Sequence, residues 1–101
     1  MGFEREGKEM ESSGSEEISL VLYDAYEFPS PPIKRTCIVH PDNPVLILRQ
    51  MFLNNFKYKS DTFEFQFKNK KIVDEEKSFL FYEIRDKSVI NLVKKVIFGF
   101  I

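Results

Sequence analysis

Hydrophobic residues fall at every second position in residues 18–22, a spacing typical of a β-strand with one buried face. The same period returns in residues 33–40, where Cys37 and Val39 share one face. Residues 24–32 interrupt the pattern with three prolines, which cannot donate a backbone hydrogen bond within a sheet. The pattern therefore predicts two strands joined as a hairpin with a long, proline-rich loop.

After the second strand the spacing lengthens to three or four residues, which predicts an α-helix. The recurring apolar residues are Val45, Leu48, Phe52 and Phe56. Residues 41–44 are typical of a helix start, because Asp42 or Asn43 can cap the free N–H groups and Pro44 suits the first helical position. We expect the helix to end near residues 54–55.

Three further strands are predicted in the second half of the chain. Aromatic and polar side chains alternate over residues 63–67, a turn near Asn69 leads to residues 70–73, and residues 89–93 are almost continuously apolar. A hairpin followed by one helix and more strands predicts an α+β fold. Its expected form is a mixed sheet of four or five strands packed on one α-helix.

Residues 1–17 differ from the rest of the chain, because they contain six glutamates and two basic residues and show no apolar periodicity. We expect a disordered acidic tail over residues 1–17, a folded domain over residues 18–97, and an apolar C-terminal tail over residues 98–101. Ser13 and Glu16 match an acidic-kinase pattern, although a plain solvated tail explains the same residues. The tail has a net charge of −4 and the remainder of the chain +3.

Length and composition restrict the protein's class. A chain of 101 residues forms one domain, and a single cysteine excludes an internal disulfide and fits a reducing compartment. We expect neither a membrane-spanning segment nor a signal peptide, and Glu6 occupies the position at which the N-myristoylation motif requires Ser or Thr. We therefore expect an intracellular protein that binds neither membranes nor, given its sparse basic charge, nucleic acid.

Candidate catalytic and ligand-binding residues are few. His40 has no second histidine and no metal-ligand spacing around it, and Cys37 falls on the inward face of its strand, where a thiol is inert. The four glycines are scattered rather than gathered in a phosphate-binding loop. We expect no enzymatic activity, no metal and no cofactor.

The second half of the chain resembles ubiquitin and its relatives. The resemblance rests on residues 65–74, on Phe79, on Tyr82-Glu83-Ile84 and Ser88, and on Ile90 to Val93, and it extends over about residues 18–95. It implies the ubiquitin-like β-grasp fold, in which the hydroxyl of Tyr82 bonds to backbone across the loop. The longer segment between the helix and the third strand is similar to the SUMO-like branch of the family.

Two departures from ubiquitin bear on function. Conjugated modifiers end in Gly-Gly, whereas this sequence has bulky residues over 96–101, so we expect that it is not conjugated to other proteins. Gln66 replaces the central isoleucine of ubiquitin's apolar binding patch and Asn91 replaces its histidine, while Val93 is retained. Receptors of that apolar patch are expected to bind poorly.

One candidate binding surface is a basic, polar face of the sheet. By the resemblance, lysines are expected near one end of the sheet, beside Gln66 and Asn91; they are Lys68, Lys70, Lys94 and Lys95. Such a face would attract an acidic segment of a partner protein. An ordinary solvated surface, in which lysines discourage edge pairing, is the alternative.

The other candidate surface lies between the second strand and the helix. The helix is apolar nearly all round, since Ile47, Met51 and two leucines lie outside the expected core stripe. In SUMO-like proteins this groove accepts an extended peptide as an added strand, and here Ile38 and His40 would face it. The alternative is that the long hairpin loop and residues 98–101 cover the helix.

These patterns together predict a ubiquitin-like module that acts as an adaptor or scaffold by binding proteins inside the cell. The candidate contact residues are Ile38, His40, Ile47, Met51, Gln66, Lys68, Lys70, Asn91, Val93 and Lys95. On its own the module is expected to be a monomer. The alternative is an obligate structural subunit whose apolar helix and C-terminal residues are buried in a larger assembly.

Overall fold

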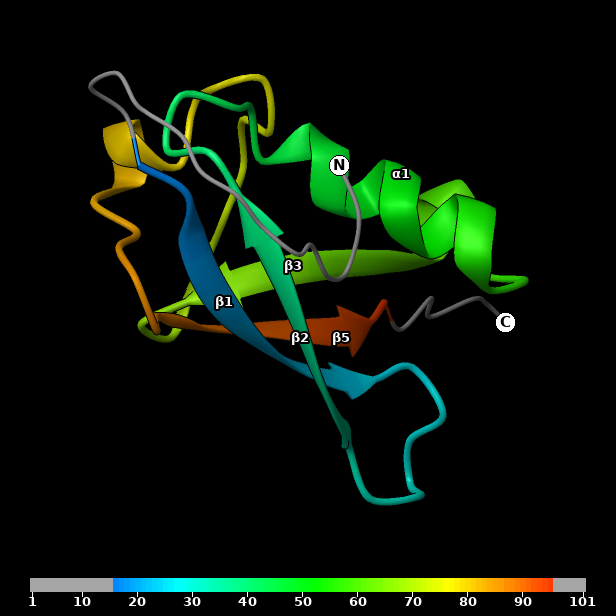
Figure 1. Cartoon of the computed structure of the whole chain (residues 1–101). Helices are drawn as coiled ribbons and strands as arrows, with labels where there is room; N and C mark the ends of the chain where they lie inside the picture. The colour runs from blue at the N-terminus through cyan, green and yellow to red at the C-terminus, as the bar shows by residue number, and fades with distance from the viewer. Residues whose placement is uncertain (1–15, 96–101) are drawn as a thin grey trace.

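The alternating segments of the chain form one sheet, and the apolar helix lies across one of its faces (Figure 1). The computed structural model describes residues 16–95. The predicted tail over residues 1–17 lies outside that range except for Glu16 and Glu17, and residues 96–101 lie outside it entirely. The elements are β1 (Ile18–Ala25), β2 (Ile33–Val39), α1 (Leu46–Asn55), β3 (Phe63–Phe67), β4 (Lys70–Lys71) and β5 (Val89–Lys94), with 3-10 turns at Ser60–Thr62 and Leu80–Tyr82. The predicted α+β fold, a mixed five-stranded sheet with one helix, is confirmed.

The strand order is β2-β1-β5-β3-β4, so the first and last strands of the chain lie side by side in the sheet. β1 and β5 are parallel, with Leu22 beside Ile90. The other pairs are antiparallel, and Phe65 lies beside Leu92 between β3 and β5. Leu20, Leu22 and Phe65 therefore each have a buried neighbour on the next strand.

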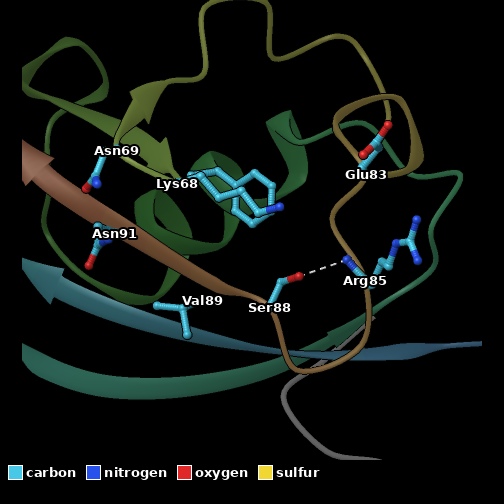
Figure 2. Close-up of a pocket in the computed structure, with 8 residues that line it drawn as sticks. Lys68, Asn69, Glu83, Arg85, Ser88, Val89 and Asn91 are labelled. Carbon is cyan, nitrogen blue, oxygen red and sulfur yellow. Dashed lines mark hydrogen bonds between the residues drawn. The ribbon is translucent and has the colours of Figure 1, made fainter.

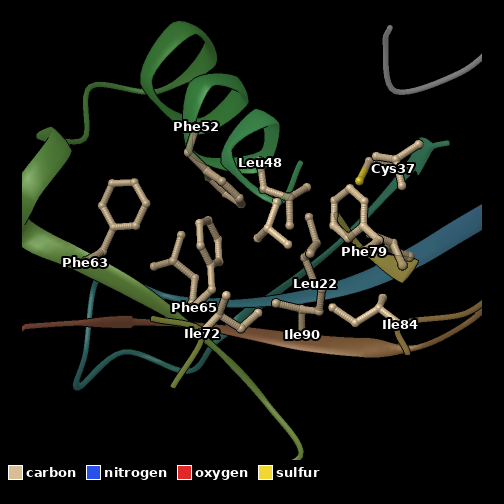
Figure 3. Packing of buried hydrophobic residues seen from close by; sticks show 14 residues of the cluster. Leu22, Cys37, Leu48, Phe52, Phe63, Phe65, Ile72, Phe79, Ile84 and Ile90 are labelled. Atoms are coloured by element: carbon tan, nitrogen blue, oxygen red, sulfur yellow. The ribbon is translucent and has the colours of Figure 1, made fainter. Parts of the chain in front are cut away.

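The core lies between the sheet and α1 (Figure 3). Its fourteen buried residues are Leu20, Leu22, Cys37, Val39, Val45, Leu48, Phe52, Phe63, Phe65, Ile72, Phe79, Ile84, Ile90 and Leu92. The rings of Phe63 and Phe65 meet edge to face at 5.7 Å between centroids, the geometry that aromatic pairs prefer. The strand alternation and helix spacing thus identify the buried face of each element correctly.

The predicted cap of the helix is wrong. α1 begins at Leu46 without any side-chain cap, and the Asn43 Oδ1 accepts a hydrogen bond from the His40 N–H. The free N–H groups of Val45 and Leu46 instead donate to the carbonyls of Lys77 (3.0 Å) and Glu75 (2.8 Å). A loop distant in sequence satisfies the donors that a local side chain was expected to satisfy.

The β3–β4 connection is a two-residue turn. Lys68 and Asn69 both have positive φ, 55° and 65°, as a type I′ hairpin turn requires. The predicted turn near Asn69 is confirmed, whereas the strand predicted for residues 70–73 is assigned only at Lys70–Lys71. One more backbone bond, from the Ile72 N–H to the Phe65 carbonyl, continues the pairing.

Tyr82 fastens the long loop before β5. Its hydroxyl donates to the Asp74 carbonyl at 2.7 Å and lies 3.3 Å from the Asp74 N–H. This is the backbone contact that the resemblance to ubiquitin implied. Ile84, two residues further on, is buried in the core and holds the same loop against the sheet.

Candidate interaction surface

The sheet face opposite α1 carries one row of side chains that crosses all five strands. The neighbours in this row are Lys34, Tyr23, Asn91, Gln66 and Lys71, in the order β2, β1, β5, β3, β4. Each of the three central residues follows directly after a core residue, so its side chain points away from the helix. We call this side of the sheet the outer face.

Apolar side chains lie in the rows on either side of Asn91 and Gln66 on the outer face. Val21 pairs with Val89 in a second row, and Ala25 pairs with Val93 in a third. Tyr23 is 36% exposed and Val89 is 43% exposed. Exposed aromatic and aliphatic residues inside a polar rim are typical of protein interfaces.

A hollow of about 590 Å³ opens on the outer face at the start of β5 (Figure 2). Val89 and Asn91 line it from β5, the turn residues Lys68 and Asn69 line one side, and the loop before β5 lines the other. The residues from that loop are Glu83, Arg85 and Ser88. The Ser88 Oγ accepts a hydrogen bond from the Arg85 N–H at 2.8 Å, which holds this loop in place.

Basic side chains outnumber acidic ones around the outer face. The cations are Lys34, Lys68, Lys71 and Arg85, and the carboxylates are Glu64 and Glu83. The Lys71 Nζ lies 3.4 Å from the Glu64 carboxylate, and the Lys68 Nζ lies over the ring of Phe67. The rim therefore has a net positive charge, as expected for a surface that attracts an acidic segment.

The expected gathering of four lysines at one end of the sheet is wrong. Lys70 pairs with Phe67, whereas Lys94 pairs with Phe63, four residues away on β3. At roughly 3.3 Å per residue the two positions lie about 13 Å apart. The Lys94 Nζ lies over the ring of Tyr26, and the Lys95 N–H donates to the Thr62 carbonyl. Antiparallel pairing of β3 and β5 separates Lys94 and Lys95 from the turn lysines.

Gln66 and Asn91, which replace two residues of ubiquitin's apolar patch by the resemblance, are directly paired, and Val93 is paired with Glu64 on the same face. Ile38 also belongs to this face, because its neighbour on β1 is Ser19. The structure thus brings together Gln66, Asn91, Val93 and Lys68 of the predicted contact residues, with Ile38 at one edge.

The predicted groove between β2 and α1 is bordered by half-buried helix residues and by the open edge of β2. Ile47 and Met51 are half-buried and pack against the core, so core contact accounts for part of the apolar helix surface. β2 pairs only with β1 among the described strands, which leaves its other edge open. His40 is exposed beside that edge, with its Nε2 3.7 Å from a Glu17 carboxylate oxygen.

A buried carboxylate braces the proline-rich loop, and the sequence patterns did not single it out. Asp24 is only 2% exposed and accepts hydrogen bonds from the Tyr58 hydroxyl (2.6 Å), the Arg35 Nε (3.0 Å) and the Tyr26 N–H (2.9 Å). Burial, together with the hydrogen bond to Asp24, raises the pKa of Tyr58 to about 12. Asp24 occupies the inward position that follows Leu20 and Leu22, a signal that could have found it.

Catalysis or metal binding by residues 16–95 would depend on their nucleophilic and metal-ligating side chains. Cys37 is buried, and that burial raises the pKa of its thiol to about 11, which disfavours the nucleophilic thiolate. Within the described range, His, Cys, Asp and Glu side chains form no group of three suited to a metal ion. Over the same range, no helix has the length and apolar character needed to cross a membrane.

Comparisons with known proteins give a likeness in structure. No protein-family model and no curated protein matches this sequence. The C-terminal ubiquitin-like domain of human 2'-5'-oligoadenylate synthetase-like protein (p59 OASL) aligns with a TM-score of 0.68 and 21% identity, over 88% of this chain and 95% of that one.

Two further structures align over similar lengths. The UBL domain of Plasmodium falciparum Dsk2 gives a TM-score of 0.65 and 20% identity, over 79% of this chain and 100% of that one. A protein of Arabidopsis thaliana gives a TM-score of 0.64 and 16% identity, over 84% of this chain and 94% of that one. These identities are low, so the likeness concerns the fold: the chain has the β-grasp fold of ubiquitin-like domains.

Proposed function

We propose that this protein is a ubiquitin-like interaction module that binds a protein partner through the outer face of its sheet. The observation that supports this most directly is the exposure of Tyr23 and Val89 in the middle of a polar, basic surface. Aromatic residues at the centre of a polar rim contribute most of the binding energy in many interfaces. Binding, rather than catalysis, is the activity that this arrangement favours.

The partner's chemistry follows from the charge of the rim. An acidic segment with one or two apolar side chains would place carboxylates near Lys68 and Arg85 and apolar groups on Tyr23 and Val89. Long-range attraction would speed association, and apolar contact at the centre would slow dissociation. In this proposal the protein acts as an adaptor or scaffold inside the cell, without being conjugated itself.

The test compares matched variants in affinity purification from cell extract, with each partner quantified against wild type. Tyr23→Glu introduces a charge at the centre of the outer face, and the expected result is loss of the partners that wild type retains. Val73→Glu is the control, because Val73 is 80% exposed and contributes to none of the outer-face rows. Equal retention by Tyr23→Glu, with an unchanged unfolding midpoint, would refute the proposed surface.

Met51→Lys, compared with Tyr23→Glu, separates the two candidate surfaces, which Ile38→Asp alone cannot do. Ile38 lies at the edge of the outer face as well as beside the open edge of β2, whereas Met51 lies on α1. Loss of partners in Met51→Lys with retention in Tyr23→Glu would assign binding to the β2–α1 groove. The opposite result supports the outer face.

A second function, an obligate subunit of a larger assembly, has one observation in its favour. Leu80 and Phe81 are 60% and 61% exposed on the 3-10 turn before β5, apart from the outer-face rows. Large adjacent apolar side chains in solvent are typical of surfaces buried by a partner. Size-exclusion chromatography with light scattering distinguishes the two: a stable monomer favours the module, and aggregation that co-expression relieves favours the subunit.

A further inference from the structure

The segment that precedes β1 has the chemistry that the outer face selects. Residues 3–11 contain four glutamates against one arginine and one lysine, and their large apolar residues are Phe3 and Met10. The outer face has the complementary character, with Tyr23 and Val89 at its centre and a basic rim. The carboxylates and apolar side chains of residues 3–11 are therefore complementary to the cations and apolar side chains of the outer face.

The chain enters the fold beside the hollow of the outer face. The Ser19 N–H donates to an Asp86 carboxylate oxygen at 2.8 Å, and the Ser19 carbonyl accepts from the Lys87 N–H at 2.6 Å. The entering chain is thus bound to the loop that contributes Arg85 and Ser88 to the hollow. Residues preceding Ser19 begin next to the basic rim.

The distance from this entry point to the hollow is short. Val89 lines the hollow and is paired with Val21 on β1. Val21 comes four residues after Glu17 in the sequence. Four residues of extended strand cover about 13 Å. The fifteen residues before Glu16 can span at most roughly 50 Å, so their length permits contact with the whole outer face.

Covalent attachment compensates for weak affinity. A short linker keeps a segment near its site at an effective concentration on the order of 1 mM. A segment with a Kd near that value would therefore occupy the face about half of the time. Contact in cis requires only a few charge pairs and one apolar anchor.

We propose that residues 3–11 bind the outer face of the same molecule and compete there with the protein partner. Their glutamates lie against Lys68 and Arg85, and Phe3 or Met10 contacts Tyr23 and Val89. This inference rests on the outer face of the proposed function and adds its regulation: partner binding requires release of the chain's own acidic segment.

The experiment uses the full chain with a spin label at Ser12→Cys and records amide signal loss by NMR. Labelling is selective for the new cysteine, because Cys37 is buried and burial raises the pKa of its thiol to about 11. We expect signal loss at Lys68, Gln66 and Asn91 on the outer face. Amides of α1, on the opposite side of the sheet, should keep their intensity.

Matched variants test the charge requirement. The same label in a chain with Glu4, Glu6, Glu9 and Glu11 all changed to Gln should restore the outer-face signals, and so should 1 M salt, where the Debye length falls to about 3 Å. The double variant Arg85→Gln with Lys68→Gln, which removes the cations of the outer face, should also restore the outer-face signals. The double variant Lys59→Gln with Lys77→Gln removes the same amount of charge elsewhere and is the control, in which the signal loss should persist. Signals lost only next to the chain's entry point, or equally over both faces, would overturn the proposal.

A mixed sample excludes contact between molecules. One chain carries the spin label without isotope labelling, and it is added to a second chain that is labelled with nitrogen-15 but carries no spin label. Signal loss at the outer face in that mixture would assign the contact to a second copy and overturn binding in cis. The measurement needs no partner, so its failure leaves the partner-purification test intact. Failure of that purification would likewise leave the NMR result standing.

Discussion

Single residues of this protein depart from strand periodicity where they stabilise a connection. Asp24 is a carboxylate at an inward strand position, and it is tolerated because Arg35, Tyr58 and a backbone N–H all donate to it. Burying such a charge without partners would cost several kcal/mol. Its three donors come from β2, the segment after α1 and the proline-rich loop, so one residue joins three parts of the fold.

Tyr82→Phe is expected to lower the free energy of unfolding by about 1 kcal/mol, the scale of one hydrogen bond. The change removes the hydroxyl that donates to the Asp74 carbonyl and leaves the ring in place. Urea denaturation of both proteins measures the difference. Tyr23→Phe is the control, since the structure gives its hydroxyl no role in the core, and an unchanged midpoint for Tyr82→Phe would contradict the assigned role.

Stability should decline in alkaline solution between about pH 9 and pH 12. Burial raises the pKa of the Cys37 thiol from 9.0 to about 11, and burial with the Asp24 hydrogen bond raises that of Tyr58 from 10.0 to about 12. Both groups therefore hold their protons more tightly in the folded chain than in the unfolded one. The unfolded state releases them first as pH rises, so the free energy of unfolding falls in this window and not below it.

Chemical denaturation at a series of pH values tests this window. Cys37→Ala should reduce the slope of stability against pH between 9 and 11, and Tyr58→Phe should reduce it between 10 and 12. Both variants are also expected to be less stable at neutral pH, so the slope is the informative quantity. Slopes identical to wild type would contradict the raised pKa values.

At the scale of elements, the start of α1 depends on the loop over residues 74–78. Arg49 donates from Nε and Nη2 to the two carboxylate oxygens of Glu75, at 2.8 and 2.6 Å, and also to the carbonyl of Phe63. The Glu75 carbonyl accepts from the Leu46 N–H at the helix start. One loop residue thus secures both the first turn of the helix and a side chain in its middle.

Glu75→Gln is expected to destabilise the fold by about 2 kcal/mol or more, because a mostly buried guanidinium loses its counter-charge. The side chains of Arg49 and Glu75 are only 15% and 13% exposed, so water cannot replace the lost contact freely. Glu76→Gln, one residue further and exposed, is the matched control and should change little. Equal stability of both variants in urea denaturation would show that the Arg49–Glu75 pair does not stabilise the start of α1.

The whole molecule has two differently used sheet faces. One face and α1 enclose the core, and the other presents Tyr23, Val89 and a basic rim to solvent. Ile47 and Met51 are half-buried against that core, which accounts for part of the apolar surface of α1. The division into two faces also shows how a small domain can have a complete core and still leave apolar side chains exposed.

Neighbouring substitutions on β1 should report on the two faces separately. Leu22→Ala is expected to cost about 2–5 kcal/mol, because it leaves a cavity between the sheet and α1. Val21→Ala, on the outer face, should cost about 1 kcal/mol or less. Thermal and urea denaturation give both values, and comparable losses at the two positions would mean that the outer face is packed against something in the isolated protein.

Several features of this fold were predictable from the sequence. The inward positions of β1, β2 and β3, the centre of α1 at Leu48 and Phe52, and the role of Tyr82 followed from apolar spacing or from a short resemblance. Such spacing is informative because each side chain's direction in a strand or helix depends on its own position alone. Burial then selects the apolar side for the core.

The tertiary structure alone decided which residues meet. Tyr23 lies beside Asn91 because β1 pairs with β5, and antiparallel pairing of β3 with β5 separates Lys94 from Lys70. The donors of α1 found carbonyls in a distant loop rather than Asp42 or Asn43. Local periodicity sets the direction of a side chain but contains no information on its neighbour across a strand, and the outer face is made of such neighbours.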